Sequence, residues 1–298
     1  MRRRPLFAVA VGWVLAAGLE GSANPTAPPG FLGEMRWTMQ DPLFGGFSGI
    51  EVSADGSGFL AVTDRGGYTN ARLTRDVDDR ITGIAADNIQ LLKGQGTAPL
   101  KMFRADSEGL AVASDGRVYI SFEGVTRVLR YDRIDGPAEN LPVAEAFRPM
   151  QVNSSLEALA IDANDVIYTV PERTGSDDRP FPVYRFINGV WDDAFAIPRS
   201  GSFLPVGADI GPDGRFYLLE RQFRGWSGFS SRLRRFSISA NGFTTEKVLL
   251  ETPVGLHDNL ESVSIWRDDQ NRLRATMIAD DNFLVLQNTE IVEYLLPD

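Results

Sequence analysis

The chain contains no cysteine and a single histidine, His257. The absence of cysteine excludes disulfides, thiolate metal sites and cysteine nucleophiles. With one imidazole, zinc sites built from several histidines are also excluded, and a Ser-His-Asp triad would have to use His257. Hydrolytic chemistry in this protein must therefore come from carboxylates, hydroxyls, arginines, lysines and metal ions bound through oxygen.

Basic residues are outnumbered as well. The chain has 30 Lys and Arg against 40 Asp and Glu, which gives a net charge of −10. A protein with this charge repels nucleic acid and anionic membrane surfaces, so we expect neither as a partner. The same charge favours the binding of cations.

No hydrophobic run reaches the usual length of a transmembrane helix. The apolar stretch from Leu6 to Leu19 follows three arginines and precedes Gly21-Ser22-Ala23. This order predicts a signal peptide over residues 1–23, cleaved after Ala23, and export to the periplasm or the medium. An uncleaved anchor is the alternative. Residues 24–33 are rich in proline, and we expect them to form a flexible lead-in.

One pattern recurs five times: an alternating apolar strand, a turn, and a second apolar strand that ends in an acid. The copies span residues 48–65, 107–124, 156–173, 206–221 and 260–281. A repeat of about 50 residues built from strands is typical of a β-propeller. No linker divides the chain, so we predict one all-β domain over residues 34–298.

The spacing predicts about five four-stranded blades, with six as the alternative because the first interval is long. Residues 34–40, EMRWTMQ, form an isolated alternating stretch at the front of the domain. We expect this stretch to pair with the C-terminal blade, because closing the ring removes exposed strand edges.

Three of the copies carry two acids each. Positions equidistant from a two-residue turn are cross-strand partners on one face. This rule pairs the acids as Glu108 with Glu123, Glu157 with Glu172, and Glu261 with Asp280.

Copies one and four lack the first acid. The same rule places Ser48 opposite Arg65 and Val206 opposite Arg221, and these copies end in Asp64 and Glu220. Further polar residues lie close by in sequence: Asp106, Asp209, Asp258, Asn259 and Asp281.

Like charges placed opposite each other destabilise a sheet unless something neutralises them. In a propeller, all of these strand ends lie at one mouth of the central channel, so the acids should converge there. Carboxylate oxygens bind hard divalent cations such as Ca²⁺. The candidate metal ligands are Asp64, Glu108, Glu123, Glu157, Glu172, Glu220, Glu261 and Asp280. The alternative is that each acid bonds the backbone or an arginine of a neighbouring blade.

The hairpins FSGIEVS…FLAVTDRG, DSEGLAV…DGRVYISFEG, SSLEALAID…IYTVPER and NLESVSI resemble the bacterial "esterase-like activity of phytase" family. This family is a phytase-like propeller of exported proteins, and the resemblance covers roughly Gly45 to Val292. It implies phosphoester hydrolysis by recurring acids. The positions that match these acids are Asp64, Glu108, Glu123, Glu157, Glu172, Glu220 and Glu261. Copy four departs from the pattern, with Val206 in place of an acid.

We therefore expect an exported, monomeric hydrolase of small phosphoesters that depends on a divalent cation. The residues expected to carry the chemistry are Glu108, Glu157, Glu261, Arg65, Arg173 and Arg221, with the arginines holding phosphate oxygens. Two alternatives remain open: a non-catalytic binding propeller with a structural cation, and a Ca²⁺-dependent lactonase or carboxylesterase on the same ring.

Overall fold

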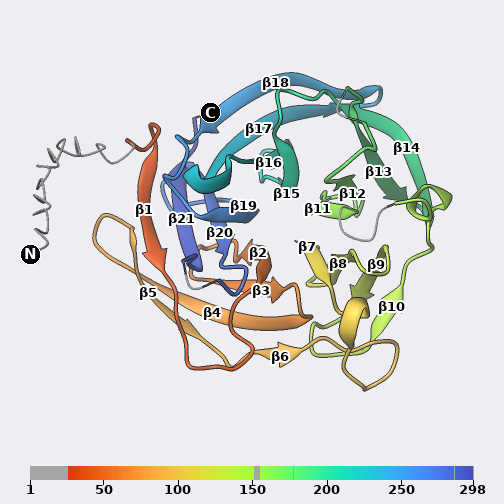
Figure 1. Cartoon of the computed structure of the whole chain (residues 1–298), viewed down its shortest axis with the longest axis horizontal. Coiled ribbons are helices and arrows are strands. Elements are labelled where there is room, and N and C mark those ends of the chain that lie inside the picture. The colour runs from red at the N-terminus through yellow and green to blue at the C-terminus, as the bar shows by residue number, and fades with distance from the viewer. Residues whose placement is uncertain (1–25, 151–154, 177, 285, 298) are drawn as a thin grey trace, which may run out of the picture.

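The computed structural model describes residues 26–150, 155–176, 178–284 and 286–297, and its strands form a ring of antiparallel sheets (Figure 1). There are five sheets, each a blade, so the prediction of a five-bladed all-β propeller is confirmed. The predicted signal peptide lies outside the described residues. Within the described part of the chain, no helix is long and apolar enough to cross a bilayer.

The blades follow one another along the chain. Blade 1 consists of β2 (Phe47–Val52), β3 (Gly58–Thr63), β4 (Gly67–Arg75), β5 (Ile81–Ala86) and the short β6 (Gln90–Leu91), which pairs with β4. Blade 2 consists of β7 (Ser107–Val112), β8 (Val118–Phe122), β9 (Arg127–Tyr131) and β10 (Ala138–Asn140). Blade 3 consists of β11 (Leu156–Ile161), β12 (Ile167–Pro171), β13 (Phe181–Ile187) and β14 (Val190–Ile197).

Blade 4 consists of β15 (Leu204–Ile210), β16 (Phe216–Phe223), β17 (Phe229–Ser239) and β18 (Gly242–Glu251). Blade 5 consists of β19 (Asn259–Arg267), β20 (Leu273–Asp280), β21 (Glu290–Leu295) and β1 (Phe31–Arg36). Three 3₁₀ turns, η1 (Met102–Arg104), η2 (Glu145–Phe147) and η3 (Gly225–Ser227), lie in the connections. The first strand of each repeat lies innermost, against those of its neighbours.

The ring is closed by the N- and C-terminal strands, as predicted. β1 pairs antiparallel with β21, with Glu34 opposite Val292 and Arg36 opposite Glu290. β1 begins at Phe31, so it starts before the expected stretch at Glu34 and takes in the last residues of the expected lead-in. Pairing with β1 covers an edge of blade 5 that would otherwise expose unpaired backbone groups.

Apolar side chains fill the space between each pair of adjacent blades. Between blades 5 and 1, for example, Ile278 and Ile291 pack with Phe47 and Ile50, and all four are buried. Because both faces of each sheet are covered in this way, most residues of the inner strands are buried on both faces.

Every innermost strand contains a register shift at the same place, near its start. This β-bulge contains Ser48, Glu108, Glu157, Val206 or Glu261, depending on the blade. A bulge adds one unpaired residue to its strand, so residues that precede it lie one position away from simple hairpin counting.

The predicted cross-strand pairs of copies four and five are wrong by two residues, because the turn shifts the register by one residue and the bulge by another. Asp280 lies opposite Asn259 rather than Glu261, and Arg221 lies opposite Leu204 rather than Val206. In the other copies the backbone is shifted in the same direction. The N–H groups of Glu123, Glu172 and Asp64 bond to the carbonyls of Asp106, Ser155 and Gly46.

Glycines beside the bulges let neighbouring blades approach closely. A Cβ on Gly109 would lie 2.6 Å from the carbonyl oxygen of Glu157, and one on Gly207 would lie 2.9 Å from that of Glu261. Real Cβ atoms do not come this close to a carbonyl oxygen, so glycine is required for this contact between blades.

Candidate functional site

Carboxylates from four of the five blades gather at the end of the ring where the innermost strands begin. We call this group the acid rim. It consists of Asp64, Asp106, Glu108, Glu123, Glu157, Glu172, Glu261, Asp280 and Asp281. Most members are close enough to raise the pKa of at least one other member. The predicted convergence of acids is therefore present in the folded chain.

The tightest group in the rim is Asp106, Glu108 and Glu123 of blade 2. One carboxylate oxygen of each lies within 4.8 Å of the corresponding oxygens of the other two. Burial, followed by the charge of Glu123, raises the pKa of Glu108 well above its usual range. Burial also raises the pKa of Glu123 to about 7. Three carboxylates in this position are costly in water-poor surroundings unless a proton or a cation joins them.

Glu157 extends this group across to blade 3. Burial, with the charges of Glu108 and Glu123 next in size, raises its pKa well above the usual range. The Glu157 side chain also acts on the pKa of Glu123, and the two carboxylates can share one proton. Glu123 also accepts a hydrogen bond from the backbone N–H of Ser155 at 3.1 Å. A bound divalent cation could take the place of the shared proton.

Arg221 of blade 4 supplies positive charge to the other side of the rim. Its guanidinium pairs with Glu261, lies 3.4 Å from Glu172, and donates to Asn259 Oδ1 at 2.6 Å. Neither Glu108 nor Glu157 forms an ion pair among the residues that the structure describes. On the side of Arg221 the protein itself neutralises the carboxylates of the rim. On the side of Glu108 and Glu157 it does not.

A third part of the rim lies where blade 5 meets blade 1. Burial raises the pKa of Asp64 to about 6 and that of Asp280 to about 8. Asp64 Oδ1 is buried and has no hydrogen-bond partner in the part of the chain that the structure describes. Arg65 lies beside it, exposed, with its guanidinium carbon 3.3 Å from the centre of the Phe283 ring. An orphaned buried carboxylate oxygen is what a site for a positive ligand requires.

Two of the predicted site residues lie in different surroundings. Glu220 is fully buried, and its carboxylate oxygens accept hydrogen bonds from Arg232 Nε at 2.9 Å and Arg234 Nε at 2.8 Å. The structure therefore separates Glu220 from the other acids. Arg173 is half-exposed and pairs with Glu172 at 3.1 Å, so it lies at the margin of the rim.

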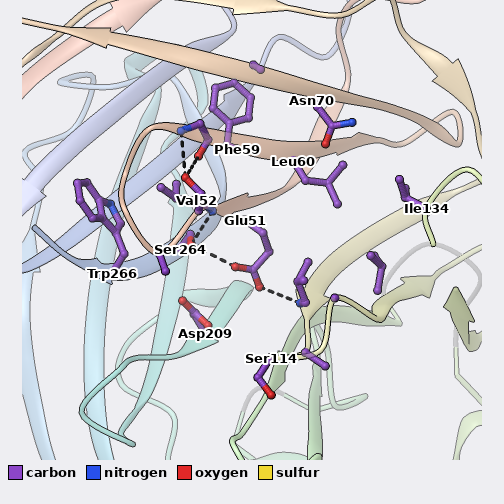
Figure 2. Close-up of a pocket in the computed structure, with 18 of the residues that line it drawn as sticks. Glu51, Val52, Phe59, Leu60, Asn70, Ser114, Ile134, Asp209, Ser264 and Trp266 are labelled. Atoms are coloured by element: carbon purple, nitrogen blue, oxygen red, sulfur yellow. Dashed lines mark hydrogen bonds between the residues drawn. The ribbon is translucent and has the colours of Figure 1, made fainter. Parts of the chain in front are cut away.

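The opposite end of the ring carries a pocket of about 1450 Å³, which we call the turn-side pocket (Figure 2). Its wall includes turns that join the first and second strands of the blades, and Glu51 and Asp209 lie at its base. Glu51 accepts hydrogen bonds from Ser264 Oγ at 3.2 Å and from the N–H of Val112 at 3.3 Å. Asp209 accepts one from the N–H of Ile265 at 2.5 Å.

Burial raises the pKa of both carboxyls, that of Asp209 to about 7. The sequence prediction did not include Glu51 in any site. It also missed Asp106 as a member of the candidate ligand group. The signal for Asp106 was its position just before the repeat, where a two-residue shift brings it opposite Glu123.

The sequence of the chain also matches that of a known family over most of its length. Residues 42–283 match the phytase-like family, described as "Esterase-like activity of phytase". The chain belongs to this phytase-like family. The resemblance inferred from the hairpins is confirmed. No curated protein matches the chain in sequence.

Solved structures of several other proteins resemble the phytase-like chain at low sequence identity. Virginiamycin B lyase of Staphylococcus aureus is 17% identical, with 89% of this chain and 74% of the lyase covered and a TM-score of 0.44. A gluconolactonase of Xanthomonas campestris is 13% identical, with 84% and 72% covered and a TM-score of 0.46. The PQQ-bound aldose sugar dehydrogenase of Streptomyces coelicolor is 11% identical, with 90% and 100% covered and a TM-score of 0.45.

The donors of the rim fit a hard divalent cation. All of its ligand atoms are oxygens, and carboxylates with backbone or amide oxygens are what Ca²⁺ binds in proteins. The orphaned Asp64 Oδ1 and the group of Asp106, Glu108 and Glu123 offer two places for such an ion.

Proposed function

We propose that this protein is an exported, monomeric hydrolase of small phosphoesters whose acid rim holds a divalent cation, Ca²⁺ in particular. The observation that supports this proposal most directly is the unequal neutralisation of the rim. Arg221 pairs with Glu172 and Glu261, whereas Asp106, Glu108, Glu123 and Glu157 form no ion pair with an arginine in the described part of the chain. A bound cation would neutralise this half and give the rim affinity for an anionic substrate.

In this proposal Asp106, Glu108 and Glu123 hold the cation. When bound, the ion would supply positive charge that offsets the negative charge of a phosphoryl group in the transition state. Arg65 and Arg173 are exposed at the rim and can bind phosphate oxygens from the solvent side. Arg221 stays beside Glu261 and positions it.

Glu157 is the candidate proton donor. Burial is the largest cause of its raised pKa, so Glu157 itself can keep a proton near neutral pH while Glu123 holds the cation. A carboxylic acid that remains protonated at this pH can donate to the oxygen of a leaving alcohol. The buried position of Glu157 on the bulge of β11 directs it toward the candidate ion ligands.

A non-catalytic binding propeller is the second candidate. The observation that favours it is that Arg221 already satisfies Glu172 and Glu261, so part of the rim is a closed ion-pair network. In that case the cation would stabilise the ring and no substrate would be turned over.

The deciding experiment measures phosphate release from phytate and p-nitrophenyl phosphate, with added Ca²⁺ and with a chelator. We expect Ca²⁺-dependent release that falls about 100-fold or more in Glu108→Gln and Glu157→Gln, because each removes a group that acts in the transition state. Glu139→Gln, an exposed acid on β10, is the matched control and should keep full activity.

The outcomes separate the candidates. Phosphate release that is unchanged by the chelator and unchanged in Glu108→Gln and Glu157→Gln would overturn the hydrolase proposal. Ca²⁺-dependent melting with no turnover would favour the binding propeller. A parallel panel of carboxylic esters and lactones tests the third possibility, a Ca²⁺-dependent lactonase or carboxylesterase, with the same protein and the same variants.

A further inference from the structure

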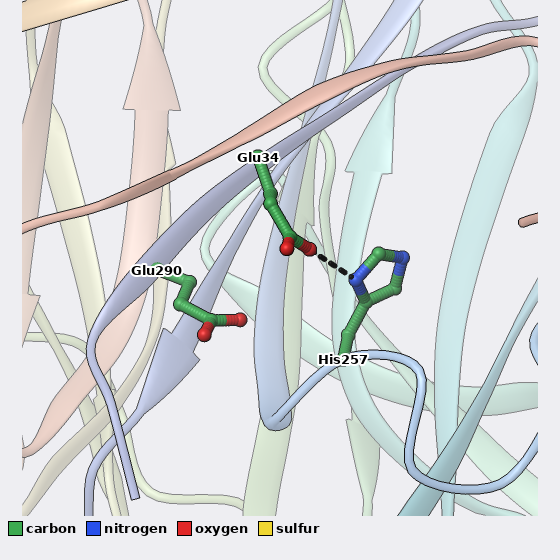
Figure 3. A group of neighbouring side chains, drawn as sticks. All are labelled: Glu34, His257 and Glu290. Atoms are coloured by element: carbon green, nitrogen blue, oxygen red, sulfur yellow. Dashed lines mark hydrogen bonds and ion pairs between the residues drawn. The ribbon is translucent and has the colours of Figure 1, made fainter. Parts of the chain in front are cut away.

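Two glutamates and the single histidine of the chain converge at the closure of the ring, apart from the acid rim (Figure 3). Glu34 lies on β1, Glu290 begins β21, and His257 lies in the loop that leads into β19. One candidate ligand atom from each lies within 4.8 Å of those of the other two. Glu34 and Glu290 are diagonal neighbours on one face of the β1–β21 pair, since Glu290 lies opposite Arg36.

The separation of the donors fits a shared metal ion. His257 Nδ1 lies 3.1 Å from Glu34 Oε2. Two ligands bound to one tetrahedral Zn²⁺ through bonds of about 2.0–2.2 Å lie about 3.3–3.5 Å apart. A shift of a few tenths of an ångström would therefore bring both atoms to bonding distance from one ion.

The imidazole is held in the orientation that a metal ligand needs. The His257 side chain is only 1% exposed, and its Nε2 lies 2.6 Å from the hydroxyl of Tyr294. Metal-binding histidines almost always donate their second ring N–H to such a partner. The tyrosine hydroxyl can donate or accept, so it satisfies Nε2 both with and without a metal on Nδ1. Phe31 packs against the imidazole, with ring centres 5.7 Å apart.

Glu290 forms no ion pair among the residues that the structure describes. Arg36, opposite it on β1, attracts it more weakly than Glu34 and Asp258 repel it, and the backbone of Asp258 donates to it. The Asp258 side chain is not a further ligand candidate, since its oxygens accept hydrogen bonds from Gln287 Nε2 at 3.1 Å and the N–H of Asn288 at 2.7 Å. A half-buried carboxylate with two acids close by and no ion pair, beside a buried imidazole, therefore points to a positive ligand.

We propose that Glu34, His257 and Glu290 form a second metal site, which takes a borderline divalent ion of the Zn²⁺ or Co²⁺ class. One nitrogen and two carboxylates suit these ions, whereas the all-oxygen rim suits Ca²⁺. Glu34 is half-exposed, which leaves a path for the ion and a position for water as a fourth ligand. The metal ties β1 to β21 and to the loop before β19, and so fastens the strand that closes the ring.

The test titrates the purified full chain with Co²⁺ in excess Ca²⁺, which occupies the rim, and records the visible absorption of the cobalt. We expect one equivalent of Co²⁺ with the spectrum of a nitrogen-ligated, low-coordinate ion, displaced by Zn²⁺. Glu34→Gln and Glu290→Gln each remove one ligand oxygen and should weaken binding at least 10-fold. Zn²⁺ at 100 times its Kd should raise the Tm of the unaltered chain by about 5 °C.

Glu139→Gln again serves as the matched control, because it removes an exposed glutamate from another outer strand, β10. It should bind Co²⁺ like the unaltered chain. Glu34→Gln should keep its Ca²⁺-dependent melting, which shows that the ring is folded and that the two sites are separate. A cobalt spectrum without a nitrogen ligand, or a Zn²⁺ effect that persists in both Glu34→Gln and Glu290→Gln, would overturn the proposal.

Discussion

The two ends of the ring axis both carry buried carboxyls, but they neutralise them differently. At the turn-side pocket, Glu51 and Asp209 each accept hydrogen bonds from the backbone N–H of a neighbouring blade, at 3.3 and 2.5 Å. At the acid rim, many more carboxylates converge, and Asp64 Oδ1 has no hydrogen-bond partner among the described residues. At the turn-side pocket, the protein backbone therefore supplies hydrogen bonds to the buried carboxyls. At the acid rim, neutralisation of the carboxylates depends on protons, Arg221 or an added cation.

The difference arises from the backbone at the two ends of the innermost strands. Each of these strands has a bulge at its rim end, and an unpaired bulge residue such as Glu108 or Glu157 is directed out of the regular ladder. Toward the turn side the ladder is regular, so side chains there meet backbone donors of the adjacent blade. The same repeat thus produces one end with unneutralised carboxylates and one end whose carboxyls are hydrogen-bonded to the backbone.

Glu220→Gln is expected to have the largest effect on stability. This variant tests whether Glu220 belongs to the acid rim or only occupies the equivalent position in its repeat. The change removes the charge between Arg232 and Arg234 and leaves both guanidinium groups buried. Breaking such a pair costs about 3–5 kcal/mol. Urea unfolding should show this loss, whereas the rise in Tm caused by Ca²⁺ should remain. A lost Ca²⁺ response with little change in stability would assign Glu220 to the rim instead.

The pH dependence of stability should differ between the ends. Burial raises the pKa of Asp64, Glu123 and Asp280 to about 6, 7 and 8. The folded state therefore binds more protons than the unfolded state above pH 4.5, so without metal the Tm should fall between pH 5 and 8. Ca²⁺ binds the ionised form, so its stabilising effect should grow over the same range.

Variants assign this pH effect to one end or the other. Glu123→Gln should flatten the fall in Tm and remove most of the Ca²⁺ effect. Asp209→Asn, whose carboxyl has a pKa raised to about 7, should flatten the fall by a smaller amount and leave the Ca²⁺ effect intact. Equal responses to Ca²⁺ in the two variants would contradict the distinction between the ends.

The smallest effect is expected from an ion pair on the turn side. Arg117 lies 2.8 Å from Asp165, joining the turns of blades 2 and 3, with the two side chains 26% and 52% exposed. Exposed pairs of this kind contribute about 1 kcal/mol or less. Arg117→Gln should lower the Tm by no more than about 2–4 °C, and less in high salt. A larger loss would mean that the turns carry more of the stability of the ring than the buried inner strands suggest.

Much of the fold was readable from the sequence because each repeat carries its own pattern. Alternating apolar residues, turns and terminal acids mark the first two strands of every blade, and the isolated stretch near Glu34 marks the closing strand. These signals are local, and a repeat of about 50 residues leaves few architectures. The gathering of the acids followed from the same reasoning, since equivalent strand ends meet at one end of a ring.

The partners of each acid were decided by tertiary structure. Hairpin counting placed Glu261 opposite Asp280, but the geometry of the turn and a bulge that the sequence does not announce together moved the register by two residues. Glu220 and Glu123 occupy equivalent positions in their repeats. Arg234 of the next strand neutralises Glu220, whereas Glu123 lies among other carboxylates. Sequence pattern sets which residues point inward, because side-chain direction is local. Charge balance depends on which groups from distant strands come within a few ångströms, and only the folded ring fixes that.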